Sequence, residues 1–200
     1  MTGRRADHVA IASRVADRAR VLDVGCGDGE LLAVLQEMRG ADARGLEISA
    51  AGAQACLEKG FSVIQGDADV DLEVFPDNGF DAAVLSKSLQ DMRRPAHVLG
   101  ELARIAPEIL ISFRNYGHWR RRLTLFATGR MPAPRTGAWH DAEALHPSTA
   151  KDLVGLAAEL GLSVRAMAPV GETGVGAFRE AGLRRLNWGA ADAILHLARD

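Results

Sequence analysis

The sequence is poor in the features that mark secreted and membrane-spanning proteins. It has only two cysteines, Cys26 and Cys56, which form neither a CxxC pair nor a metal-binding cluster. At 200 residues and 48% hydrophobic content, the chain can bury a sizeable core without disulfide bonds. No run of about 18 apolar residues is present, and charges are scattered through the N-terminal segment. We therefore expect a cytoplasmic protein without a membrane partner.

An excess of one sign of charge is also lacking. The 24 lysines and arginines nearly cancel the 26 aspartates and glutamates, for a formal net charge of -2. No whole-surface field is therefore available to hold a polyanion, and we expect no nucleic-acid partner. The exception is local, because the stretch SFRNYGHWRRRL, residues 112–123, gathers positive charges and the only tyrosine. It is a candidate for a pocket rim or for a protein-binding face.

Short apolar runs alternate with segments of helical periodicity along most of the chain. The predicted strands are VLDV (21–24), ARGLEI (43–48), FSVIQGD (61–67), FDAAVLS (80–86), ILISF (109–113), LSVRAMAPV (162–170) and DAILHLA (192–198). The predicted helices are residues 7–19, 30–38, 49–60, 95–106 and 149–160, the last opened by a capping box of Thr149 and Asp152. This alternation predicts an α/β fold built on a parallel sheet of about seven strands, in one domain spanning residues 1–200.

Two segments interrupt the alternation. Residues 114–147 are rich in proline, glycine, tryptophan and histidine, and contain at most one helix, near residues 118–129. Residues 171–189 are glycine-rich and basic. Loops this long within a compact domain are usually functional covers or mobile segments, and we assign the first segment as a lid or insert and the second as a loop.

The most specific signal is the turn VLDVGCGDGELL, in which a buried strand passes directly into a helix. Gly25, Gly27 and Gly29 let the backbone of this turn approach a ligand without interference from a Cβ atom. Glu47 ends the next strand, 18 residues after Gly29, where a carboxylate can accept hydrogen bonds from both hydroxyls of a ribose. Asp67 ends the third strand and is placed to contact an adenine edge. The combined spacing favours a nucleotide-type ligand.

Carboxylates beside this turn distinguish between two such ligands. The NAD fingerprint expects a glycine three positions after the second glycine of the turn, but position 30 is glutamate. Asp23 and Asp28 suit a cation better than a pyrophosphate, and Asp23 can attract the amine of S-adenosylmethionine (SAM). We therefore favour SAM or S-adenosylhomocysteine, and keep an NAD-dependent oxidoreductase as the alternative. The predicted cofactor-binding residues are Asp23, Gly25, Cys26, Gly27, Asp28, Gly29, Glu47, Ile48, Gly66, Asp67, Ala68 and Ser86.

The same motifs resemble those of a known family. VLDVGCGDG, Glu47 and QGDAD are similar to the class I SAM-dependent methyltransferases, and VIQGDAD, FPDNGFDAAVLSKSLQ, RRPAHVL, SFRNYGHWRRRL and TGRMP together resemble the MetW family of methionine biosynthesis proteins. The likeness runs from about residue 15 to about residue 170. It implies a seven-stranded, mostly parallel Rossmann-like sheet with an antiparallel last strand and helices on both faces. It also implies work alongside homoserine O-acetyltransferase (MetX) in forming O-acetylhomoserine.

The chain departs from the family pattern where a substrate or partner would meet the cofactor. Arg114 and Tyr116 stand where proline and phenylalanine are usual, Lys87 where glutamine is usual, and His140 where tyrosine is usual. Because ligands of open parallel sheets bind outside the carboxyl ends of the strands, residues 114–116 are predicted to form the lip of the pocket. The helix that follows is expected to turn its arginines outward. The predicted substrate or partner residues are Arg114, Asn115, Tyr116, Trp119, Arg120 and Arg121.

A catalytic residue is harder to assign. The fourth strand ends in LSKS rather than in an Asn/Asp-Pro-Pro-aromatic run, which argues against methylation of nucleic-acid nitrogens. His118, His140 and His146 are candidate bases because the pKa of histidine lies near neutrality, but with one nearby acid their spacing does not predict a metal site. Two functions stay open. One is a SAM-binding accessory that senses the end product of the pathway and acts on the acyltransferase, and the other is a SAM-dependent methyltransferase of an unidentified small molecule.

Overall fold

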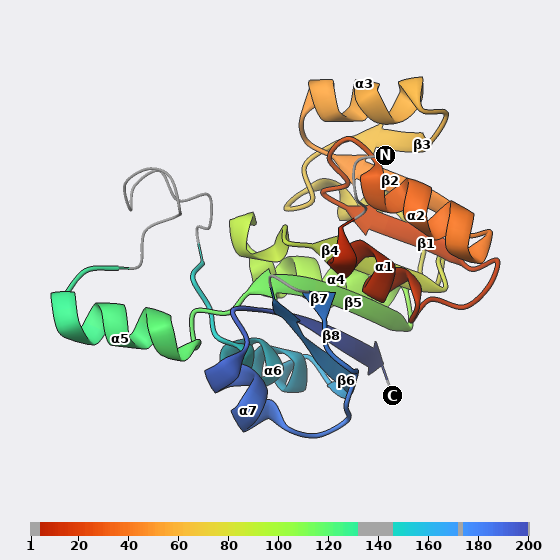
Figure 1. Cartoon of the computed structure of the whole chain (residues 1–200). Helices are drawn as coiled ribbons and strands as arrows, with labels where there is room; N and C mark the ends of the chain where they lie inside the picture. The colour runs from red at the N-terminus through yellow and green to blue at the C-terminus, as the bar shows by residue number, and fades with distance from the viewer. Residues whose placement is uncertain (1–4, 132–145, 172–173, 200) are drawn as a thin grey trace.

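The computed structural model describes residues 5–131, 146–171 and 174–199, and its strands form one sheet in the order β3-β2-β1-β4-β5-β8-β6-β7 (Figure 1). The strands are β1 (Arg20–Val24), β2 (Asp42–Glu47), β3 (Ser62–Gln65), β4 (Ala82–Ser86), β5 (Glu108–Arg114), β6 (Leu162–Gly171), β7 (Gly174–Val175) and β8 (Asp192–Arg199). The helices are α1 (Ala6–Ala12), α2 (Glu30–Arg39), α3 (Ala50–Glu58), α4 (Pro95–Ile105), α5 (Trp119–Thr128), α6 (Ala150–Glu159) and α7 (Leu183–Gly189), with short 3-10 turns η1 (Asp71–Val74) and η2 (Leu89–Asp91).

The fold class predicted from the sequence is confirmed. All seven predicted strands are present, β1 to β5 pair in parallel, and β8 runs antiparallel between β5 and β6. Helices cover both faces of the sheet (Figure 1). The two-residue strand β7 pairs with the end of β6 and adds an eighth member that was not predicted. A strand this short carries no alternation by which a sequence pattern could reveal it.

Alternate residues of the central strands enter two hydrophobic cores. In β1, Leu22 and Val24 belong to the core under α4 and α6, whereas Val21 belongs to the core under α1 and α2. β4 and β5 alternate in the same way, because successive side chains of a strand point to opposite faces of the sheet. Packing on both faces fixes the carboxyl ends of β1, β2 and β4 along one edge of the sheet, where the candidate site lies.

The helices largely follow their sequence signals. α6 begins with the predicted capping box, in which Thr149 Oγ1 accepts from the Asp152 N–H and Asp152 Oδ2 accepts from the Thr149 N–H. α1 is shorter than predicted, because it ends at Ala12 instead of continuing to residue 19. Val15 and Ala19 are nevertheless buried, so the apolar spacing that resembled a helix is satisfied by the turns that follow α1.

The two interrupting segments differ from each other. Within residues 114–147, the described part contains the expected helix, α5, which projects from the body of the molecule (Figure 1), and residues 132–145 lie outside the description. The segment 171–189 is not simply a loop, since it contains β7 and α7. α7 is fixed because Leu186 is buried in the core and the side chain of Asn115 binds main-chain oxygens at the end of the helix. Composition alone did not reveal this long-range anchor.

Candidate functional site

A cavity of about 580 Å³, which we call the strand-end cavity, lies at the carboxyl ends of β1, β2, β3 and β4. This is the edge at which open parallel sheets bind their ligands. The lining includes seven of the residues predicted to bind a cofactor, namely Gly25, Glu47, Ile48, Gly66, Asp67, Ala68 and Ser86. It also includes residues that were not predicted for this role, namely Leu46, Asp69, Lys87, Ser88, Asp91, Met92 and Arg93.

The glycine turn is held against the segment that follows β4. Gly25 has a φ of +76°, and a Cβ atom at this position would lie 2.8 Å from the Cβ of Ser88. The Ser88 hydroxyl donates a hydrogen bond to the Val24 carbonyl oxygen (2.8 Å). Close approach at Gly25 is thus made by a side chain of the protein itself, and the predicted approach of this backbone to a ligand stays a prediction.

Glu47 is a fixed acceptor at the end of β2. Its Oε2 accepts from the Gly27 N–H and its Oε1 accepts from the Ser49 N–H, both at 2.8 Å. The carboxylate thereby joins the glycine turn to the start of α3. Each oxygen of a carboxylate has two lone pairs, so both can still accept a hydrogen bond from a ligand hydroxyl.

Asp23 is the buried carboxylate of the site. Its exposed fraction is 1%, and its Oδ1 has no hydrogen-bond partner among the described residues. Burial, followed by the nearby Glu47 carboxylate, raises the pKa of Asp23 to about 7, and the positive charge of Arg5 opposes this rise. Asp23 does not line the cavity but precedes Gly25 by two residues in the chain. A buried acceptor without a partner suits a cationic donor.

Charged side chains from α1, from the residue after β4 and from β8 form an ionic cluster at the cavity wall. Asp7 is buried and pairs with Arg5 (2.6 Å), and its Oδ2 lies 4.0 Å from Lys87 Nζ. Lys87 also donates to Asp192 Oδ2 (3.1 Å) and has a φ of +62°, which is unusual for a residue with a side chain. The sequence indicated Lys87 only as a departure from the family pattern. The structure places it on the cavity wall and in this ionic cluster.

Arg93 lines the cavity together with the acidic residues that follow β3. Arg93 pairs with Asp67, the residue predicted to contact an adenine edge, and Asp69 accepts from the N–H groups of Arg93 (2.8 Å) and Arg94 (2.7 Å). Asp67 Oδ1 is also engaged, because it accepts from the Asp69 N–H (2.9 Å). Arg93 was overlooked as a site residue, although it stands in the motif RRPAHVL and precedes a predicted helix.

The remaining predicted cofactor residues do not line the cavity. Cys26 and Cys56 are free thiols with their sulfurs 3.7 Å apart, and burial raises the pKa of both. This is the environment of unreactive packing cysteines. The Asp28 carboxylate pairs with Lys59 at the end of α3 (2.9 Å). Gly27 and Gly29 shape the turn without contributing to the lining.

Asn115 requires a correction. It was predicted at the lip of the pocket, but it is fully buried. Its Nδ2 donates to the carbonyl oxygens of Leu186, Asn187 and Ala190, and its Oδ1 accepts from the Gly117 and Ala150 N–H groups. The residue joins β5 to α6 and α7, and its role is structural. Sequence alone gave no indication of these partners, because all but one lie at least 35 residues away.

The predicted partner residues of α5 separate into two groups. Arg121 folds back, donating to the carbonyl oxygens of Asn115 (2.6 Å) and Ala191 (2.7 Å), and its guanidinium lies 5.2 Å from the ring centre of Tyr116. Arg120 instead stacks over the exposed ring of Trp119 (5.3 Å). Arg121 is therefore part of the scaffold, whereas Arg120 and Trp119 belong to the surface.

The candidate bases do not meet at the strand-end cavity. His118 lines a different cavity of about 470 Å³, and burial, followed by Arg121 and Arg120, lowers its pKa. The backbone N–H of His146 donates to the Gln90 carbonyl oxygen, and His140 lies outside the described residues.

Within the described ranges, no group of three or more His, Cys, Asp or Glu side chains could hold a metal ion, and no helix is long and apolar enough to cross a membrane.

Comparison with known proteins identifies the family. The sequence model described as methionine biosynthesis protein MetW matches residues 5–196. The chain belongs to the MetW family. A relative in Rhodopirellula baltica, the bifunctional methionine biosynthesis protein MetXA/MetW, is 28% identical over 134 residues, which cover 63% of this chain and 22% of the relative. The MetW-family chain thus spans about a fifth of the length of that protein. Membership assigns it to methionine biosynthesis.

Solved structures confirm the class I SAM-dependent methyltransferase fold of this MetW-family chain. A SAM-dependent methyltransferase from Thermotoga maritima matches with a TM-score of 0.71 at 14% identity, over 98% of this chain and 88% of the other. One from Aquifex aeolicus matches with a TM-score of 0.64 at 16% identity, over 96% and 88%. The [4+2]-cyclase SpnF matches with a TM-score of 0.66 at 19% identity, over 97% and 79%. A fold that includes a cyclase does not by itself determine the reaction.

Proposed function

We propose that this MetW-family protein binds SAM or S-adenosylhomocysteine in the strand-end cavity and acts with homoserine O-acetyltransferase in methionine biosynthesis. The observation that carries the proposal is the set of acidic residues at this edge of the sheet. Glu47 and Asp67, from the ends of neighbouring strands, line one cavity, and the buried carboxylate of Asp23 lies at the start of the adjoining turn.

The residues present fit SAM. The Glu47 oxygens are held in place by two backbone N–H groups and have lone pairs available for ribose hydroxyls. Asp23 Oδ1, which is buried without a partner among the described residues, is suited to the cationic methionine end. Ala68 and Asp67 flank the end at which an adenine would lie. When bound, SAM supplies a positive charge and an electrophilic methyl group.

The cavity lining carries charged side chains but no described histidine. Its described titratable side chains are those of Glu47, Asp67, Asp69, Asp91, Lys87 and Arg93. Because the end of β4 and the residues after it read Ser86-Lys87-Ser88 and offer no recognisable acceptor motif, we propose a SAM-binding accessory whose ligand reports the supply of the methionine-derived cofactor to the acyltransferase. In the alternative, a small-molecule methyltransferase, a carboxylate of the lining would have to serve as the base.

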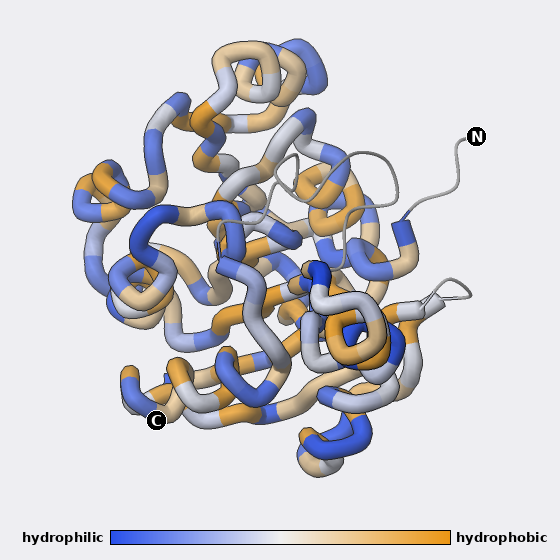
Figure 2. The backbone as a smooth tube through the Cα atoms, turned by 90° about the vertical axis from the view of Figure 1, so that its left-hand side faces the viewer, coloured by the Kyte–Doolittle hydropathy of each residue, from blue (hydrophilic) through white to orange (hydrophobic). Residues whose placement is uncertain are grey.

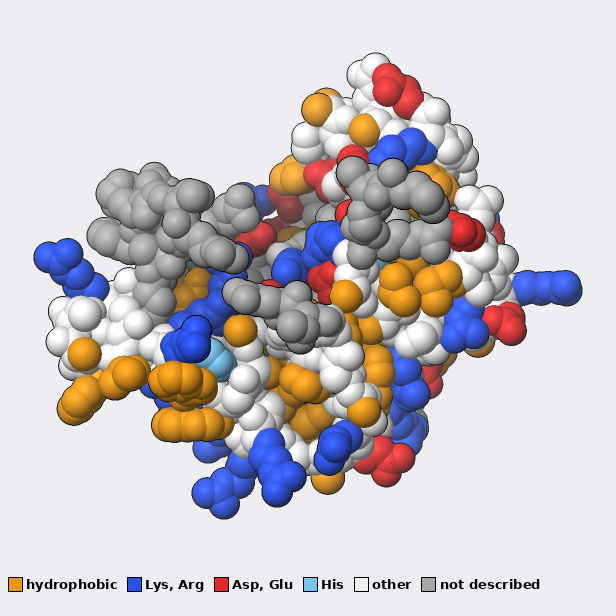
Figure 3. Space-filling model, viewed as in Figure 1, with side chains coloured by type: hydrophobic (Ala, Val, Ile, Leu, Met, Phe, Trp, Pro, Cys, Tyr) orange, Lys and Arg blue, Asp and Glu red, His pale blue; other side chains and the backbone are white. Residues whose placement is uncertain are grey.

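A physical partnership with the acyltransferase has two supports. The Rhodopirellula relative carries MetXA and MetW together in its name. On this chain, α5 offers a surface suited to a partner, because none of its residues is buried. Leu123, Phe126 and the ring of Trp119 are exposed, and Figure 3 shows hydrophobic and basic side chains gathered on this part of the molecule. Exposed aromatic residues beside arginines are typical of the centres of protein interfaces.

Figure 2 views the molecule from the α5 side and shows hydrophobic and hydrophilic positions around the turns of that helix. Arg122 extends the surface, because its guanidinium stacks 5.6 Å from the ring centre of Trp188 on α7. α5 and the exposed ring of Trp188 are thus parts of one face, which we call the α5 face. We propose that the acyltransferase contacts the α5 face through apolar side chains bordered by acidic groups.

Calorimetric titration with SAM, S-adenosylhomocysteine and NAD tests the ligand, and co-purification with the acyltransferase in the presence and absence of SAM tests the partner. We expect both adenosyl ligands to bind and NAD not to bind. Binding of NAD without binding of either adenosyl ligand would overturn the proposal. Turnover of labelled SAM on a metabolite extract would favour the alternative, a small-molecule methyltransferase.

The α5 face can be tested with a matched pair of variants. Leu123 is 54% exposed on α5 and Leu57 is 59% exposed on α3. Leu123→Asp should abolish acyltransferase co-purification and leave SAM affinity unchanged, whereas Leu57→Asp should affect neither. Equal effects of the two variants on co-purification would contradict assignment of the contact to α5.

A further inference from the structure

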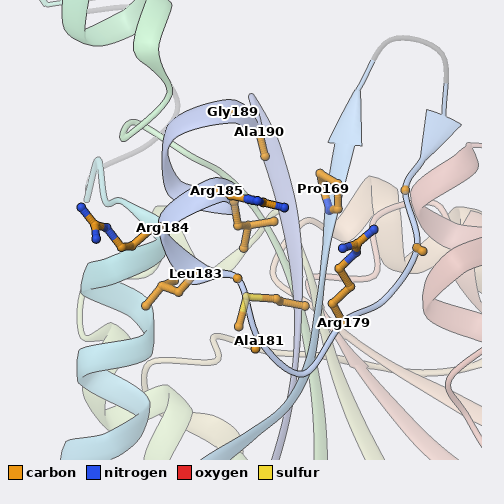
Figure 4. A pocket seen from close by; sticks show the side chains of 13 residues that line it. Pro169, Arg179, Ala181, Leu183, Arg184, Arg185, Gly189 and Ala190 are labelled. Carbon is orange, nitrogen blue, oxygen red and sulfur yellow. The ribbon is translucent and has the colours of Figure 1, made fainter.

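A second large cavity is unrelated to the strand-end cavity. It has a volume of about 880 Å³ and lies between α7, the end of β6 and the segment 176–182 (Figure 4). It shares no lining residue with the strand-end cavity. Its lining is Met167, Pro169, Gly176, Ala177, Arg179, Ala181, Gly182, Leu183, Arg184, Arg185, Leu186, Gly189 and Ala190. The volume is in the range of small-molecule sites.

The interior of this cavity is apolar. Met167, Leu186 and Ala190 form a wall that belongs to the hydrophobic core, and Pro169 and Leu183 extend it. An apolar chain or ring placed here would lose contact with water at little cost in unpaired polar groups. The site therefore suits the hydrophobic part of a ligand.

The charged side chains of the lining are all arginines. Arg179, Arg184 and Arg185 have no carboxylate partner among the described residues, and the neighbouring Glu180 does not line the cavity. In Figure 4 the side chains of Arg179 and Arg185 lie on the side of the cavity near Pro169, whereas the side chain of Arg184 points away. Two guanidinium groups at the border of an apolar cavity can bind one carboxylate by charged hydrogen bonds.

We propose that this cavity binds an amphiphilic carboxylate, a small molecule with an apolar chain or ring and one anionic head. The apolar wall takes the chain, and Arg179 and Arg185 take the head. The site is independent of SAM and of the acyltransferase, so it stands or falls separately from the function proposed above.

The probe is decanoate, titrated calorimetrically into the full-length protein, with decanol and decyltrimethylammonium as ligands of equal chain length and different charge. We expect one saturable site for decanoate, weaker binding of decanol and weakest binding of the cation. Arg179→Gln together with Arg185→Gln should weaken decanoate binding by about tenfold or more and leave decanol binding within about twofold. Arg184→Gln is the matched control and should stay within about twofold of the original affinity for decanoate.

A second variant tests the position of the chain. Ala181 is exposed and lines the cavity, so Ala181→Trp should fill it without disturbing the core and should prevent decanoate binding. Retained binding in this variant would place the ligand elsewhere and overturn the proposal. Equal affinity for all three head groups, absence of saturation by decanoate, or an Arg184→Gln effect equal to that of the Arg179 and Arg185 pair would overturn it as well.

Discussion

The charged side chains of two regions differ in whether they have partners within the chain. One region is the strand-end cavity, and the other is the C-terminal flank, which comprises α5, α7 and the arginine-lined cavity. At the strand ends Glu47 is held by two backbone N–H groups and Arg93 by Asp67, and Asp23 Oδ1 is the buried exception without a described partner. On the flank, Arg179 and Arg185 have no described carboxylate partner, and Phe126 is 90% exposed. The first arrangement is preorganised for a small ligand, whereas the second leaves groups available for something outside the chain.

The strand-end region should be the more sensitive to a change of one side chain. Gly25→Val adds a Cβ 2.8 Å from Ser88 Cβ at a φ of +76°, which combines overpacking with an unfavourable backbone conformation. We expect a loss of about 3–5 kcal/mol in the free energy of unfolding, measured in urea.

Gly27→Ala is the matched control. Gly27 has a φ of +56°, but a Cβ there would meet no atom within 4 Å. Only the backbone penalty of about 1–2 kcal/mol should remain. A Gly27→Ala loss as large as that of Gly25→Val would mean that contact with Ser88 is not what restricts the turn.

Asn115 joins β5 to α6 and to α7 of the flank, and its replacement should lower the free energy of unfolding somewhat less than Gly25→Val does. Asn115→Leu leaves the carbonyl oxygens of Leu186, Asn187 and Ala190 without their donor in a buried site. We expect a loss of about 3 kcal/mol in urea unfolding. Hydrogen exchange should show faster opening of α7 than of α2. Uniform acceleration across the chain would indicate that the flank does not open separately.

The sequence was informative wherever the determining partners are close along the chain. The capping box of Thr149, the glycine turn and the strand alternation all act over a few residues, and each is present in the structure. The residues at the strand ends also followed, because parallel strands place their carboxyl ends together. This reasoning placed Glu47 and Asp67 on one cavity.

The features that the sequence did not predict depend on contacts between side chains from distant segments of the chain. Asn115 was assigned to the pocket lip because it follows a strand, but its partners on α6 and α7 place it in the core. Arg93 and Lys87 were missed as lining residues because a charged residue after a strand or before a helix is usually solvated. The lack of a described carboxylate partner for Arg179 and Arg185 likewise depends on how side chains are placed in space, which composition cannot show.

Asp23 allows a test of the strand-end region in which stability and binding change in opposite directions. Its folded-state pKa of about 7 lies above the ordinary value of 3.8, so its contribution to stability is full below about pH 4 and is lost as the pH rises through about 7. Asp23→Asn removes this loss. Relative to the original chain, the stability of the variant should rise by about 2–3 kcal/mol between about pH 5 and about pH 8, because most of the loss falls in this range.

The same Asp23→Asn variant should bind SAM at least about tenfold more weakly at about pH 8, because the acceptor for the cationic end has lost its charge. Urea unfolding at the two pH values and calorimetric titration measure both effects. An unchanged pH dependence of unfolding would remove Asp23 as the titrating group, and unchanged SAM affinity would remove it as the acceptor.

The smallest effect on stability is expected on the flank. Phe126 is 90% exposed on α5, so Phe126→Ala should change the free energy of unfolding by less than about 0.5 kcal/mol. The affinity of the Phe126→Ala variant for the acyltransferase should nevertheless fall by about tenfold, because an exposed aromatic side chain contributes to the free energy of binding when a complex buries it. Val74→Ala, at a residue 67% exposed on η1, is the control that should change neither quantity. If Phe126→Ala lowered the free energy of unfolding and left the affinity for the acyltransferase unchanged, Phe126 would stabilise the fold and not bind a partner. The proposed difference between the flank and the strand-end region would then be wrong.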